Sequence, residues 1–125
     1  MTTSRLTSAH RAVVALQAGA DRRGPGGAVT RALCGSGEHP PPCPLASHHT
    51  AVDGVDDALA VRIVFAAARD DEAGVRARIE TALAGGESTG PDGAVSRWRL
   101  REAGPDALRE DEHDLAARLA GQAGA

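Results

Sequence analysis

A run of three prolines at positions 40–42 limits what the first half of this chain can fold into. Proline fixes φ at about −65° and has no backbone N–H, so helix interiors and central strands exclude it. The stretch 35–44 holds four prolines and two glycines, and we expect it to form a stiff loop with polyproline geometry. Regular elements are therefore expected only on either side of this loop.

Large apolar side chains are scarce in the chain. Leu, Ile, Val, Met, Phe and Trp together provide 24 of the 125 residues, and alanine alone provides 26. This composition predicts a small core. The net charge of only −3 is far from the high net charge that is typical of disordered chains. We expect a small α+β protein in two parts. Residues 1–50 hold an N-terminal helix, a Gly/Pro linker and a Cys/His-rich loop, and residues 51–125 form a β-α-β-α half.

The N-terminal part has helical spacing of its apolar residues. Leu6, Val13 and Leu16 fit one face of a short amphipathic helix over residues 7–19. The Gly/Pro linker follows this helix, and one further helical turn is expected at residues 29–33.

The second half begins with the clearest strand pattern in the chain. Residues 59–66 alternate large apolar side chains with smaller or polar ones and include several β-branched residues, which is typical of a strand. Acidic residues at 70–72 then favour a helix start. Val75, Ile79 and Leu83 recur every four residues on one helical face, and the glycine pair at 85–86 should end this helix.

A loop over residues 87–93 should lead to a second strand at 94–102, with Trp98 on its apolar face. Gly104 and the two residues after it are then expected to start a last helix. Because a helix separates the two strands, the pattern permits a parallel β-α-β unit. Two strands are marginal, so a third strand near residues 50–55 or a partner subunit should complete the sheet.

One segment has the residue types of a metal site. Two thiols and two imidazoles form a tetrahedral ligand set that suits zinc, and the candidates are Cys34, His39, Cys43, His48 and His49. The two histidines at 48 and 49 would compete for the fourth position. Zinc would also order a loop that buries little apolar surface. The spacing is not that of a zinc finger, and the segment contains no Cys-x-x-Cys.

Other interpretations of this segment stay open. It could be a polar loop with two free cysteines, or its cysteines could form a disulfide, although a cytoplasmic protein would disfavour that. The sequence Cys43-Pro44-Leu45 resembles the short Cys-Pro motif of haem-sensing proteins, which implies thiolate ligation of haem iron. A cysteine nucleophile with a histidine base is a further alternative, but nothing in the sequence supplies an orienting third group.

A basic stripe is expected on the second strand. Arg97, Arg99 and Arg101 alternate with Trp98 and its apolar neighbours, so their side chains share one face at a spacing of about 7 Å. This stripe could bind an anion, an acidic partner or a nucleic-acid backbone. It could equally be an exposed strand face that charge keeps soluble. Arg62 would extend the stripe if the two predicted strands pair.

These observations favour a non-catalytic accessory or regulatory protein that has a structural zinc site and acts through a protein partner or as a homodimer. The alternatives are a metal-dependent enzyme with an open coordination position and a binder of nucleic acid or anions. The chain has no lysine, which excludes Schiff-base and Walker-type chemistry. No apolar run is long enough to span a membrane, and we expect a cytoplasmic location.

Overall fold

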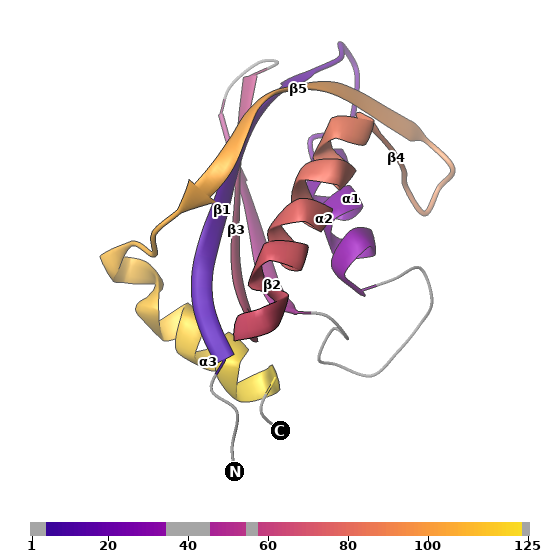
Figure 1. The fold of residues 1–125 in the computed structure, drawn as a ribbon. Coiled ribbons are helices and arrows are strands. Elements are labelled where there is room, and N and C mark those ends of the chain that lie inside the picture. The colour runs from indigo at the N-terminus through magenta and orange to yellow at the C-terminus, as the bar shows by residue number, and fades with distance from the viewer. Residues whose placement is uncertain (1–4, 35–45, 55–57, 124–125) are drawn as a thin grey trace.

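The structure is a computed structural model that describes residues 5–34, 46–54 and 58–123. It has an α+β fold with one curled, five-stranded antiparallel sheet and three helices (Figure 1). In chain order the elements are β1 (Arg5–Leu16), α1 (Gly24–Cys34), β2 (Ser47–Asp53), β3 (Ala58–Ala68), α2 (Glu72–Gly85), β4 (Glu87–Thr89), β5 (Val95–Asp106) and α3 (His113–Ala123). Single 3₁₀ turns at Arg69–Asp71 and Glu110–Glu112 precede α2 and α3.

The strand order in the sheet is β2-β3-β1-β5-β4, and each described neighbouring pair is antiparallel. Helices α1 and α2 cover one face of the sheet, whereas α3 lies on the other (Figure 1). The order of β1-α1-β2-β3-α2-β5 and the place of β1 between β3 and β5 are those of the split β-α-β, or ferredoxin-like, topology. This topology hosts many activities and therefore does not define a function.

The helix expected over residues 7–19 is wrong, because this segment forms the central strand β1. Ala12, Val14 and Leu16 pack under α1 and α2, while Ala9 packs under α3. A strand that is covered on both faces loses the simple alternation of apolar and polar residues. Its apolar spacing then also fits a helix, which explains the error.

The main core lies between the sheet and the α1–α2 layer. The strand predicted at residues 59–66 is β3, and the predicted helix is α2, which ends with Gly86 in a left-handed conformation at φ 70°. Together with Trp98 of β5, both elements contribute to the core through side chains that the pattern assigned to it, namely Leu59, Val61, Ile63, Phe65, Val75, Ile79 and Leu83. The predicted strand at 94–102 corresponds to β5.

The second half differs from the expectation in two details. The strands β3 and β5 run parallel to each other on either side of α2 in the sequence, as the pattern permits, but they are not neighbours, because β1 lies between them and pairs antiparallel with both. The last helix does not start at Gly104, because β5 continues to Asp106 and α3 begins only at His113. The third strand expected near residues 50–55 is present as β2. Residues from 1–50 and from 51–125 thus build one sheet.

A buried arginine holds α3 against the sheet. The Arg62 side chain is only 10% exposed, and its Nε and Nη2 donate to the two carboxylate oxygens of Glu112 at 2.6 and 2.7 Å. Its Nη1 donates to Asp106 at 2.7 Å and its Nη2 to the carbonyl of Ala107 at 2.8 Å. The apolar part of this interface uses small residues such as Ala66 and Ala116, so these charged hydrogen bonds carry much of its specificity.

Candidate functional site

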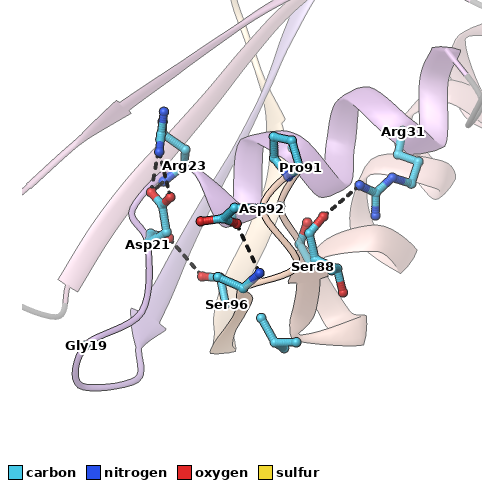
Figure 2. Close-up of a pocket in the computed structure, with 14 residues that line it drawn as sticks. Gly19, Asp21, Arg23, Arg31, Ser88, Pro91, Asp92 and Ser96 are labelled. Carbon is cyan, nitrogen blue, oxygen red and sulfur yellow. Dashed lines mark hydrogen bonds and ion pairs between the residues drawn. The ribbon is translucent and has the colours of Figure 1, made fainter. Parts of the chain in front are cut away.

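A groove with a volume of about 730 Å³ lies between α1 and the β4–β5 hairpin (Figure 2). Gly24, Gly27 and Arg31 of α1 line one wall, and Ser88, Pro91 and Asp92 of the hairpin line the other. The three α1 positions are spaced by three and four residues, so they form one stripe along the helix. The groove follows that stripe for about two helical turns.

Two glycines give the groove its shape. A Cβ at Gly24 would overlap the Ser96 side chain, so only glycine lets the start of α1 lie this close to β5. A Cβ at Gly27 would be 3.6 Å from Ser88 Oγ, an ordinary contact distance. The missing side chain at Gly27 therefore leaves an open path from the groove to the Ser88 hydroxyl.

The acidic side chains of the groove already have donors. The Asp21 carboxylate accepts from the backbone N–H and the guanidinium of Arg23 at 2.9 to 3.2 Å, and these bonds hold the pKa of Asp21 below its usual value. Ser96 Oγ donates to the Asp21 carbonyl at 2.8 Å. At the hairpin tip, Asp92 accepts from the backbone N–H of Ala94 at 3.0 Å. Figure 2 shows these pairs on one side of the groove.

Two hydrogen-bonding side chains of the groove, one on each wall, are largely unused. Ser88 is 8% exposed, and within the described chain its hydroxyl makes no hydrogen bond. Arg31 donates one bond, from Nη2 to the Thr89 carbonyl at 3.0 Å, and pairs with no acid of the described residues. The Ser88 hydroxyl and the unused Arg31 N–H groups therefore give this groove hydrogen-bond donors for acceptor or anionic groups.

The predicted metal ligands are only partly described. His39, Cys43 and the side chain of Cys34 lie outside the described residues, and Cys34 is the last residue of α1. His48 lies on the α1 side of β2, where its Nε2 is 3.2 Å from Thr30 Oγ1, and burial lowers its pKa. His49 is exposed on the opposite face, since successive strand residues alternate. Within residues 5–34, 46–54 and 58–123 no three potential ligands form a metal cluster.

The arginines predicted to form a stripe are exposed on β5. Arg97 pairs with Glu87 of β4 at 3.6 Å, and Arg99 and Arg101 lie further along the strand, where a bulge shifts the register with β1. Arg62 does not extend this stripe, because it is buried beneath α3 and bound to Glu112 and Asp106.

Sequence reasoning missed a buried polar network around His10. This histidine is 1% exposed; its Nε2 is 2.7 Å from Glu80 Oε2 and its Nδ1 is 3.0 Å from Arg76 Nη1. Because an arginine can only donate, Nδ1 accepts and Nε2–H donates to Glu80. Burial is the main cause that lowers the pKa of His10. The only signal was a histidine within an apolar segment.

No family model, curated protein or solved structure matches the chain. No helix in the described part of the chain is long and apolar enough to cross a membrane.

Proposed function

We propose that the protein is a non-catalytic, regulatory binding protein that holds a small anionic ligand in the groove between α1 and the β4–β5 hairpin. The observation that carries this proposal is the Ser88 hydroxyl, which lines the groove opposite Gly27, can be reached from it and makes no hydrogen bond within the described chain. Together with the Arg31 donors that the described chain does not use, it offers hydrogen bonds to a ligand.

The formal charges of the groove balance, with Asp21 and Asp92 against Arg23 and Arg31. Its unused hydrogen-bonding groups favour an anion, because Asp21 is neutralised by Arg23, whereas Arg31 retains unused donors. The groove also includes the first turn of α1, where the helix dipole favours negative charge. Pro91 and Val95 supply apolar surface on the hairpin side, so a ligand with an anionic group and a small apolar body fits this lining.

The same geometry supports binding without catalysis. An activated serine nucleophile needs a base within hydrogen-bond reach, and within the described chain no histidine or carboxylate bonds to Ser88. The described histidines lie elsewhere, since His10 is bound to Glu80 and His48 to Thr30.

Phenyl phosphate, inorganic phosphate and benzoate are suitable probes at constant ionic strength, with binding followed by ¹H–¹⁵N NMR. We expect shifts at the α1 and hairpin amides. Arg31→Gln should weaken binding roughly 10- to 100-fold, because a charge-assisted hydrogen bond contributes about 1.5–3 kcal/mol. Ser88→Ala should weaken binding about fivefold without loss of stability, because its hydroxyl has no protein partner.

Arg22→Gln is the matched control, because Arg22 is exposed, carries the same charge and does not line the groove. It should leave probe affinity within about twofold of the unmodified protein. Equal losses of probe affinity in Arg22→Gln and Arg31→Gln would show a nonspecific charge effect. NMR shifts confined to amides outside α1 and the hairpin would place binding outside the groove. Either result contradicts the proposal.

A structural zinc site in the Cys/His segment is a second proposal, with Cys34, His39, Cys43 and His48 as ligands. It is supported by the contact between Thr30 of α1 and His48 of β2, which brings the two ends of the segment close together. Burial lowers the pKa of His48, which favours the neutral form that binds metal. His49 is a less suitable ligand, because it lies on the opposite face of β2.

Native mass spectrometry of freshly purified protein tests this site. We expect the mass of one zinc ion, lost in His48→Gln and kept in His49→Gln. A mass equal to the bare chain, together with freely reacting thiols, would contradict zinc binding. Loss of two hydrogens would indicate a disulfide instead.

A further inference from the structure

Strand β2 is an edge of the sheet with few of the features that usually protect an edge. Its seven residues pair with β3 in continuous register, without a bulge. It contains no proline, and Asp53 is its only acid. Natural edge strands are commonly protected by charge, proline or bulges, because their free N–H and C=O groups can pair with another chain.

Both buried side-chain atoms that have no hydrogen-bond partner in the described chain belong to this strand. They are Ser47 Oγ and Thr50 Oγ1. A hollow of about 500 Å³ adjoins the strand, lined by Gly26 and Thr30 of α1 and by Thr50 and Val52 of β2. Within the described residues, an edge with few protective features, two unsatisfied hydroxyls and a neighbouring hollow occur together, so β2 has the properties of a strand that can accept a further strand.

We propose that two copies of the chain pair through antiparallel β2 strands, with Thr50 on the two-fold axis. A two-fold antiparallel pair is isologous, and residues that face each other across it must share a face of the sheet. The two-fold axis must therefore pass through a residue of β2 and not between two residues. Centring on Thr50 pairs all seven residues, whereas centring on His49 or Ala51 pairs only five.

This register also supplies partners for the unsatisfied hydroxyls. Thr50 faces Thr50 of the partner subunit, and a χ1 rotation lets the two hydroxyls bond across the axis, as threonines do in cross-strand pairs. Ser47 lies opposite Asp53 of the partner subunit, and a χ1 rotation is needed for its buried Oγ to reach that carboxylate. Val52 lies opposite His48 of the partner subunit on the α1 side, so each hollow is partly covered by the other copy.

The groove beside β4 and β5 shares only Arg23 with the hollow that this pairing would partly cover. The strands β2 and β4 are at opposite ends of the sheet, so the dimer leaves both grooves open. The interface therefore stands independently of the proposed ligand.

Analytical ultracentrifugation under reducing conditions tests the dimer. The protein concentration is varied between about 1 μM and about 1 mM, a range that covers weak association. We expect a concentration-dependent monomer–dimer equilibrium. Ala51→Lys places a charge on the exposed face of the edge and should raise the dimer Kd at least tenfold. Ala60→Lys is the control, since Ala60 is exposed on the same face one strand further in, and it should leave the Kd within about twofold. A monomer throughout the range, or equal effects of the two variants, would overturn the proposal.

Disulfide crosslinking tests the register. Thr50→Cys should give a symmetric disulfide between two copies under mild oxidation, because only residues on the axis face themselves. His49→Cys and Ala51→Cys should crosslink with each other when the two variants are mixed, and not with themselves. Peptide mapping, with the unmodified protein oxidised in parallel, separates these links from those of Cys34 and Cys43. Self-crosslinking of Ala51→Cys but not of Thr50→Cys would refute this register.

Discussion

The contact between Arg62 and Glu112 allows a quantitative prediction about how α3 is held. Glu112→Gln keeps the size of the side chain and removes its charge. The carboxylate of Glu112 is only 14% exposed and accepts two hydrogen bonds from Arg62. It also accepts from the backbone N–H of Arg109 at 2.7 Å. The change weakens the main attachment of a buried guanidinium, but Asp106 remains bound to it.

The magnitude follows from the pKa of this carboxyl. The Arg62 hydrogen bonds lower the pKa of Glu112 from 4.5 to about 2, and a lowering of this size corresponds to roughly 3 kcal/mol of stability at neutral pH. Asp106 and the adjacent solvent screen part of the charge that Glu112→Gln leaves uncompensated. We therefore expect the free energy of unfolding to fall by about 2 kcal/mol at pH 7.

Urea denaturation followed by circular dichroism measures this loss, and its pH dependence gives a second check. The native state favours ionised Glu112, so the contribution is complete above pH 4.5 and disappears as the pH falls towards about 2. The difference between the unmodified protein and Glu112→Gln should shrink over the same range. Glu110→Gln is the control, because Glu110 is exposed in the same 3₁₀ turn. A loss below about 0.5 kcal/mol at pH 7, or a difference that persists at pH 2, would refute this reasoning.

Two further predictions concern His10 and the glycines of α1. Burial lowers the pKa of His10, so the folded state binds fewer protons than the unfolded state. The contribution of neutral His10 to stability is therefore complete above pH 6.5 and is lost as the pH falls through the lowered pKa. An NMR titration of the imidazole that gives a pKa at or above 6.5 would contradict this prediction. Gly24→Ala should destabilise the protein by about 1–3 kcal/mol through overlap with Ser96, whereas Gly27→Ala should stabilise it by up to about 1 kcal/mol through helix propensity. The two variants make the same chemical change in one helix. A comparison of their thermal unfolding temperatures decides whether close packing requires glycine only at Gly24.

The elements with a regular local pattern could be predicted from the sequence. In β3, alternating side chains and β-branched residues coincide, and in α2 Val75, Ile79 and Leu83 recur at helical spacing before the glycine pair. These signals depend only on neighbouring residues. The same locality explains the error at β1, whose strand conformation depends on pairing with β3 and β5, far away in the sequence.

The groove could not be found by the same means. Arg31 belongs to α1, and Ser88 belongs to β4, which the sequence presents as a loop between two glycine-containing turns. Only the tertiary fold brings the two side chains to opposite walls of one groove. That Ser88 has no hydrogen-bond partner among the described residues is likewise a property of the fold, and no residue pattern reports it.

The central place of β1 also determines the order in which the protein can fold during synthesis. This strand leaves the ribosome before its partners β3 and β5, and the pair Ala9–Asp106 joins residues that are far apart in the sequence. Until β5 has been synthesised, one edge of β1 with its adjacent valines has no neighbour. Such long-range pairing slows folding and exposes a strand edge to aggregation. Ribosome-bound chains that stop before Val95 should therefore be protease-sensitive along β1, and protection should appear only once β5 has emerged.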